Sequence, residues 1–398
     1  MKKMLSLAAM CAVLSYAAPA SAELKFGGDA SVRVRDENFY GDTVNKVNPT
    51  TGETYKKSSD LKWQYRVRFN AAADLGNGYY FKALVTDETA DADAGGFLTG
   101  GVPAGGWRTV GYGNGEAYKL EVSNFYFGRN LENCHYALGR LPLGSFNNPV
   151  FDLTLYPNQP LENPVANINM DRVYGANYGT KIGSGMMNAT IVMLDDNSWT
   201  NTSNSGDGKF NDGYGLLLSY KFNLGNVTVE PMGLAVLTNT DIWDQRANPV
   251  HSNVTPYTVG AMVGVPAGSA KLSFGGFYTH CNDTTDEAAV TGIPGSKVKY
   301  DGYQFRVKGE VGKFMAWYDY NHTTDKSDFY GANAINGKMK STNHFVWAQY
   351  KIPVYESAAG TFSIQPTVRY LATKVKDDVA TSTDLQRLRT ELWATVTF

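Results

Sequence analysis

Cysteine is scarce in this sequence, and long apolar runs are missing from most of it. Only 3 of the 398 residues are cysteines, so a disulfide framework is excluded. Cys134 and Cys281 lie far apart along the chain, and we expect two unpaired thiols rather than a bridge. After residue 22, no apolar run reaches the length of about 18 residues that a membrane-spanning helix needs.

Motifs for catalysis and for metal binding are also missing. The 5 histidines are scattered without metal-ligand spacing, so we expect no metal site and no cofactor. No Gly-x-Ser-x-Gly motif occurs, and residues 331–338 miss the spacing of a phosphate-binding loop by one residue. The charge is nearly balanced, with 36 Lys and Arg against 38 Asp and Glu, which argues against a nucleic-acid partner. The sequence therefore predicts a protein that is not an enzyme.

The first 22 residues have the pattern of a secretory signal peptide. Met1-Lys2-Lys3 is basic, residues 4–17 are almost wholly apolar, and Ala20-Ser21-Ala22 supplies small residues for a signal peptidase. The residues before Cys11 lack the pattern expected ahead of a lipidated cysteine. We therefore expect cleavage after Ala22. Residues 23–398 then form one domain, because no linker or shift in composition divides them.

Short segments in which apolar and polar residues alternate recur along this domain. In the first of them, Val32 and Val34 alternate with Arg33 and Arg35. A strand with this period has one face suited to lipid and one polar face. Lipid admits strands only in a closed barrel, because unpaired backbone groups are costly there. The pattern predicts an all-β fold, a transmembrane antiparallel β-barrel.

We predict sixteen strands in this barrel, with fourteen or eighteen as the alternatives. Tight turns rich in Gly and Asn alternate with long polar loops, which puts both termini at the short-turn end. Sixteen strands leave an interior wide enough for an aqueous channel. The predicted strands are residues 24–35, 61–71, 79–86, 118–129, 134–141, 172–182, 186–194, 213–222, 227–237, 257–265, 271–279, 300–311, 313–321, 344–352, 361–372 and 385–398.

The last predicted strand ends in an aromatic residue, Phe398, at the carboxy terminus. This ending resembles the terminal-strand signal of Gram-negative outer-membrane proteins, which the barrel assembly machinery recognises. Phe398 is therefore our candidate assembly signal. We expect the mature protein in the cell outer membrane, in contact with membrane lipid and lipopolysaccharide.

Several of these features occur together in one known family. The signal peptide, the sixteen strands, the terminal Phe, the segment Gly139-Arg140-Leu141-Pro142 and a long loop after the fifth strand resemble the general diffusion porins of Gram-negative outer membranes. The resemblance implies a homotrimer whose barrels associate through the first few strands. It also implies a water-filled channel for passive diffusion of small hydrophilic solutes and ions, narrowed by a loop at about residues 143–170.

Charged residues on the predicted inner faces are the candidate pore residues. A row of like charges is costly unless water or counter-charges are near, and the long loop offers carboxylates. A basic wall facing an acidic loop would set a transverse field, although the basic residues could also simply fill a polar interior. The candidates are Arg33, Arg35, Arg66, Arg68 and Lys82 on the first three strands, Arg140 on the fifth, and Asp152, Glu162 and Asp171 in or after the loop.

A substrate-selective channel for sugars or anions is the alternative function. Sugar-specific porins carry aromatic residues along the lumen, and Trp317, Trp347 and Trp393 fall on predicted inner faces. The three come only partly from neighbouring strands, which weakens this alternative. A secreted β-sandwich or adhesin would explain the signal peptide, but it would not explain the inward arginines or the terminal Phe.

Overall fold

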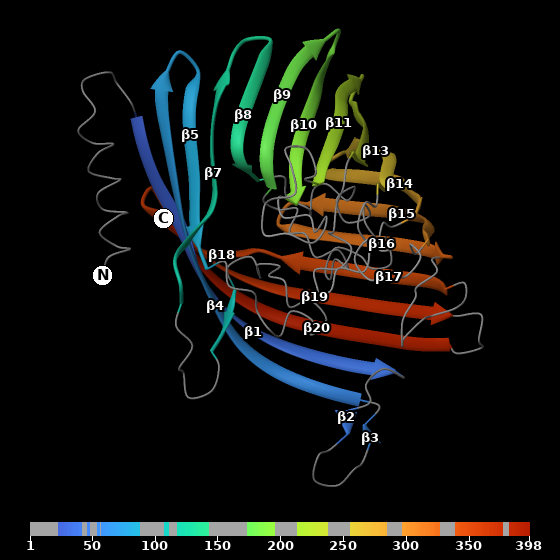
Figure 1. Ribbon diagram of the computed structural model, residues 1–398. Coiled ribbons are helices and arrows are strands. Elements are labelled where there is room, and N and C mark those ends of the chain that lie inside the picture. Colours follow the sequence, from blue (N-terminus) through green and yellow to red (C-terminus); the bar gives the residue numbers. More distant parts are fainter. Residues whose placement is uncertain are drawn as a thin grey trace, which may run out of the picture.

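The computed structural model describes residues 23–41, 46–47, 54–55, 57–87, 107–110, 118–142, 173–195, 213–237, 255–284, 297–326, 339–376 and 382–398. Every regular element in these segments is a β-strand (Figure 1). None of the described segments forms a helix long and apolar enough to cross a membrane. The expected signal peptide, residues 1–22, lies outside them.

Sixteen long strands form one closed antiparallel barrel, which confirms the predicted fold class and number. Around the barrel they follow the order of the chain, so that blue β1 lies beside red β20 in Figure 1. The strands are β1 (Glu23–Gly41), β4 (Lys57–Gly76), β5 (Tyr79–Thr86), β7 (Glu121–Asn130), β8 (Cys134–Leu141), β9 (Val173–Ile182), β10 (Gly185–Asp195), β11 (Gly213–Leu224), β12 (Val227–Val236), β13 (Tyr257–Ala267), β14 (Ala270–Thr284), β15 (Lys297–Val311), β16 (Phe314–Asp325), β17 (Met339–Tyr350), β19 (Gly360–Lys376) and β20 (Ser382–Thr397).

The remaining strands are short additions to this barrel. β18 (Ile352–Ser357) follows β17 after one residue and pairs with the same neighbour, β19, so the two act as one bent strand. β6 (Arg108–Thr109) pairs with β4 inside the loop after β5. β2 (Lys46–Val47) and β3 (Thr54–Tyr55) form a separate hairpin.

The barrel closes where β1 pairs with β20. Asp29 lies opposite Thr397, and Gly41 lies opposite Leu385. Beyond the last pair, the N–H of Phe398 donates to the carbonyl of Gly28 at 3.1 Å, and the N–H of Gly28 donates back at 2.8 Å. A Cβ on Gly28 would lie 2.9 Å from the ring of Phe398, so glycine leaves room for the terminal residue. Each long strand therefore has a partner on both sides, as a barrel in lipid requires.

The tight turns lie at the same end of the barrel as the two termini. Glu23 pairs with Asp74, three residues before the turn at Asn77 and Gly78. Gly183 and Gly312 have φ angles of 57° and 56°, which a turn of this kind needs and which glycine adopts without strain. The predicted alternation of short turns with longer connections is confirmed.

Burial alternates along the strands and identifies the two faces of the barrel. On β1, Arg33 and Arg35 are 5% and 9% exposed, whereas Val32 is 50% exposed. The buried face must be the inside, because nothing covers the outer wall of a lone barrel. The outer wall carries large apolar side chains all round, among them Trp63, Phe305 and Val368. This is the surface of a barrel that spans a membrane.

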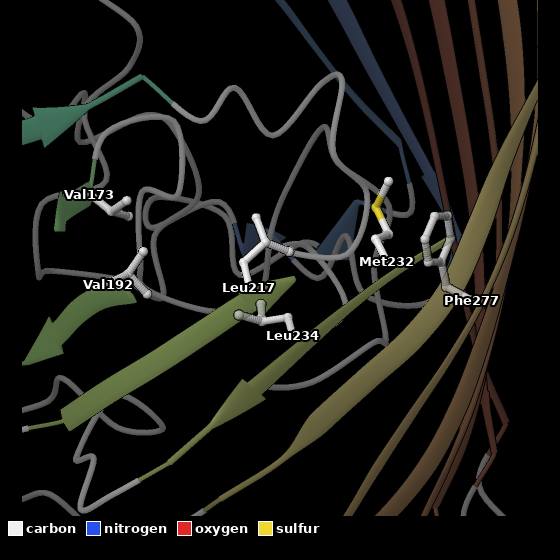
Figure 2. Close-up of a cluster of buried hydrophobic side chains, with 6 residues drawn as sticks. All are labelled: Val173, Val192, Leu217, Met232, Leu234 and Phe277. Carbon is white, nitrogen blue, oxygen red and sulfur yellow. The ribbon is translucent and has the colours of Figure 1, made fainter. Parts of the chain in front are cut away.

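One part of the inner surface is apolar. Val192 on β10 and Leu217 on β11 are buried, whereas the adjoining Ile191 and Leu218 are exposed on the outer wall. Figure 2 shows the cluster that these two inward residues form with side chains from neighbouring strands. We call it the apolar wall; its members are Val173, Val192, Leu217, Met232, Leu234 and Phe277.

Candidate channel lining

Arginine dominates a second part of the inner surface, on β19, β20, β1 and β4. These four strands are neighbours, because the barrel closes between β20 and β1 (Figure 1). Their inward positions bring cations from both ends of the chain together. We call this set the basic wall; its members are Arg33, Arg35, Lys62, Arg66, Arg68, Arg369, Arg387 and Arg389.

The carboxylates of the basic wall are each shared by several cations. Glu391, whose side chain is fully buried, lies 2.5 Å from Nε of Arg35, 3.0 Å from Nη2 of Arg369 and 3.6 Å from Nη1 of Arg33. Glu37 forms an ion pair with Arg389, and two further cations lie within 4 Å of its carboxylate oxygens.

Those two further contacts of Glu37 are to Nζ of Lys62 at 3.5 Å and to Nη1 of Arg387 at 3.9 Å. Asp29 accepts hydrogen bonds from Arg66 at 3.2 Å and from Arg68 at 2.7 Å. Among the described residues, these three carboxylates, together with Asp60 at 3.5 Å from Lys62, serve eight cations. Within the part of the chain that the structure describes, cations therefore outnumber carboxylates on the basic wall.

Tryptophans lie between the arginines along this surface. The guanidinium carbon of Arg369 lies 3.5 Å from the ring centroid of Trp347, and that of Arg33 lies 3.9 Å from the centroid of Trp107. At these distances a cation is attracted to the face of an indole ring. Trp317 stacks on Trp347 with centroids 4.5 Å apart. We call this the Arg–Trp row; around the barrel its members are Arg306, Trp317, Trp347, Arg369, Trp393, Arg33, Trp107 and Arg66.

The row connects residues that looked only partly related in the sequence. Trp317 and Trp347 are directly opposite each other on β16 and β17. Arg369 lies between Trp347 and Trp393, because its guanidinium carbon is 3.5 Å from the ring centroid of Trp347 and 5.9 Å from that of Trp393. Trp107 lies 5.1 Å from Trp393, centroid to centroid, although it lies outside the predicted strands and was not predicted to line the interior. The three predicted inward tryptophans therefore do share one surface.

The structure brings together four of the nine candidate pore residues. Arg33, Arg35, Arg66 and Arg68 all belong to the basic wall. Lys82 is opposite Ala72 on β4, on the same inner face, but it lies nearer the short turns and is exposed. Its ammonium group lies 5.5 Å from the ring of Tyr80. Lys82 is therefore not part of the basic wall.

Arg140 does not line the interior in this structure. It is opposite Phe125 on β7 and Tyr174 on β9, both exposed on the outer wall. Paired residues in a sheet point to the same side, so Arg140 faces outward, 5.5 Å from the ring of Tyr174. Both faces of β8 are mixed in sequence, which is why alternation alone misplaced it. The loop at 143–170, with Asp152 and Glu162, lies outside the described residues, as does Asp171.

Half of the basic wall and all three of the carboxylates Asp29, Glu37 and Glu391 were not among the pore residues predicted from the sequence. Arg387, Arg389 and Glu391 occupy alternate positions of the last strand, so a signal was present. Only barrel closure places them beside Arg33 and Arg35. Arg369 alternates in the same way with Val368 and Tyr370 in the predicted strand 361–372, whereas Glu37 lies beyond the end of the first predicted strand at residue 35.

Cys134 and Cys281 are both free thiols, as expected. Within the described segments, no group of three or more His, Cys, Asp or Glu residues could hold a metal ion.

No protein family model matches this chain, and no curated protein matches it. Solved structures do match. An anion-selective porin from Comamonas acidovorans is 12% identical, with a TM-score of 0.51 over 95% of this chain and 100% of that one. The outer membrane channel DcaP of Acinetobacter baumannii is 14% identical, with a TM-score of 0.51 over 96% of this chain and 99% of that one.

A third similar structure is OmpT, an outer-membrane protein of Vibrio cholerae, which is 12% identical with a TM-score of 0.50 over 96% and 99% of the two chains. At this level of identity the likeness concerns the fold. The fold, together with the apolar outer wall, belongs to barrels that span the outer membrane. This chain thus has the architecture of outer-membrane porins and channels.

Proposed function

We propose that this protein is an outer-membrane channel through which small hydrophilic solutes and ions cross by passive diffusion, and that it favours anions. The observation that supports the preference is the basic wall, where eight cations contact four carboxylates among the described residues. A lining with one sign of charge concentrates ions of the opposite sign. One of the structures with this fold is described as an anion-selective porin.

A substrate-selective channel is the second candidate, favoured by the positions of the two inner walls. The basic wall covers β19, β20, β1 and β4, and the apolar wall covers β9 to β14. In a barrel of sixteen strands these two walls face each other. The interior thus has guanidinium and indole groups on one side and apolar side chains on the other. This arrangement suits organic anions with an apolar part better than it suits sugars.

The acidic residues expected in the loop remain part of the proposal. Asp152, Glu162 and Asp171 would supply counter-charges to the basic wall and narrow the pore. The signal peptide, the absence of enzymatic activity and the role of Phe398 in assembly also stay predictions.

A homotrimer is proposed for the assembled protein. A trimer form is described for OmpT of Vibrio cholerae.

Osmotic swelling of lipid vesicles that contain the purified protein tests the proposed channel. We expect organic anions to enter faster than organic cations of the same size. The double variant Arg66→Gln, Arg387→Gln should reduce the anion rate several-fold while it leaves Asp29 and Glu37 paired with Arg68 and Arg389. Neutralising two exposed lysines near the short turns, Lys313→Gln and Lys351→Gln, is the matched control and should leave the rates unchanged.

Three outcomes have distinct meanings. Vesicles that do not swell in any solute would contradict the channel itself. Equal rates of entry for anions and cations would contradict the proposed preference for anions but not the proposed channel. Saturable inhibition by one organic anion, with slow entry of other solutes, would favour the substrate-selective channel.

A further inference from the structure

A pocket lies on the outer wall of the barrel, at the rim remote from the short turns. It has a volume of about 470 Å³ and lies over the ends of β16, β17, β19 and β20. Its charged and imidazole side chains are His322, Lys340, His344, Lys374, Lys376 and Asp384. They occupy the same alternate positions as Val346 and Val368, which are exposed on the outer wall. We call it the rim pocket.

The described residues of the rim pocket carry more positive than negative charge. Lys340 and Lys376 are directly opposite each other on β17 and β19, and Lys374 follows opposite Thr342. Like charges directly opposite in a sheet are destabilising. Asp384 is the one acid among the described lining residues, and its Oδ1 lies 3.7 Å from Nζ of Lys374. An arrangement that costs stability in this way is explained if an anion binds between the lysines.

Chemical character changes in order along the strands that form the pocket. From the middle of β17 outward, Val346 is followed at alternate positions by His344, Thr342 and Lys340. On β19 the same direction gives Val368, Tyr370, Ala372, Lys374 and Lys376. The surface therefore passes from apolar through aromatic to cationic within a few residues. This order matches a lipid molecule, whose acyl chains lie below and whose charged headgroup lies at the interface.

The middle of this surface is held by hydrogen bonds between side chains. The hydroxyl of Tyr318 and Nδ1 of His344 are 2.8 Å apart, and Nδ1 of His322 lies 3.0 Å from the hydroxyl of Thr342. Tyr370 donates to Gln386 at 3.1 Å. These contacts fix polar groups below the lysines, where hydroxyl and amide groups of a sugar could bind.

We propose that the rim pocket binds the phosphorylated sugar headgroup of a glycolipid of the outer leaflet, with its acyl chains along Val346 and Val368. Short turns of such barrels face the periplasm, so the rim pocket is at the level of the outer leaflet. The volume of about 470 Å³ exceeds what a lone phosphate needs and suits a sugar phosphate. The site lies on the outside of the barrel and is independent of what passes through it.

Native mass spectrometry of the detergent-solubilised protein tests the site, with bis-phosphorylated lipid A as the probe. The triple variant Lys340→Gln, Lys374→Gln, Lys376→Gln should bind lipid A about a hundredfold more weakly, because each lysine near a membrane surface attracts anionic lipid. The matched control neutralises three exposed lysines at the opposite rim, Lys271, Lys313 and Lys351, and should bind as the wild type does. Channel conductance should be the same for all three proteins, which shows that they are folded.

Lipid A without phosphates and inorganic phosphate alone complete the experiment. We expect the dephosphorylated lipid to bind far more weakly and inorganic phosphate not to displace lipid A at equal concentration. Wild-type binding by the triple variant would overturn the proposal, and so would equal binding of the dephosphorylated lipid. Displacement of lipid A by equimolar phosphate would show that the pocket binds a simple anion and not a glycolipid. A change in oligomer size in the triple variant, with lipid binding unaltered, would instead assign the pocket to a second copy of the chain.

Discussion

Glu391 shows how the interior tolerates so many arginines. Its carboxylate contacts Arg33 and Arg35 on one neighbouring strand and Arg369 on the other, at 3.6 Å or less. One negative charge thus compensates part of the repulsion between three cations. Removing one partner of a buried ion pair costs much more than the pair itself contributes, because the remaining charges lose their compensation.

The variant Glu391→Gln should therefore lower the free energy of unfolding by about 3 kcal/mol. Urea unfolding in lipid vesicles, followed by tryptophan fluorescence, measures it. Glu356→Gln on β18, where the side chain is exposed, is the control, with an expected change within about 0.5 kcal/mol. Equal stability of the two variants would show that the basic wall does not depend on Glu391.

At the scale of strands, the sequence allowed the elements to be predicted well and their ends less well. Period-two alternation marks the part of a strand that has lipid on one side. Beyond the membrane both faces are polar and the period is lost. β17 begins at Met339 where the alternation predicted residue 344, and β19 continues to Lys376 instead of ending at residue 372. The rim pocket lies on these extensions, so sequence periodicity could not reveal it.

Pairings between distant strands were harder to predict than the strands themselves. The basic wall depends on the register between β1 and β20, which sets Arg35 opposite Glu391 and Glu37 opposite Arg389. Nothing in the local pattern fixes that register; closure of the whole barrel does. For Arg140 the local pattern itself was the difficulty. Both faces of β8 mix apolar and polar residues, so alternation could not tell the inner face from the outer one.

The depth of a residue on the outer wall should decide the cost of adding a charge there. Val368 lies in the middle of β19 and is exposed, so Val368→Arg should lower the free energy of unfolding by about 2–4 kcal/mol. Tyr355 is also exposed but lies near the short turns, and Tyr355→Arg should cost about 0–1 kcal/mol. Both are measured by urea unfolding in vesicles. A cost that does not depend on position would contradict the assignment of this wall to lipid.

For the whole molecule, the two inner walls matter more than the balance of total charge. The full chain is close to neutral, with a formal net charge of −2, and composition alone suggests no preference between ions. The fold separates the charges, so that the described interior has a basic wall on one side and an apolar wall on the other. Ion preference is therefore a property of the closed barrel and of no single segment.

The reversal potential across a planar bilayer in a gradient of potassium chloride tests this account most directly. Chloride should be more permeant than potassium through the wild-type channel, and the sign of the reversal potential should show it. In the variant Arg66→Gln, Arg387→Gln the potential should move toward zero, while Lys313→Gln, Lys351→Gln should leave it unchanged. A reversal potential of the sign given by potassium, or one that is the same in the wall variant as in the wild type, would contradict the account.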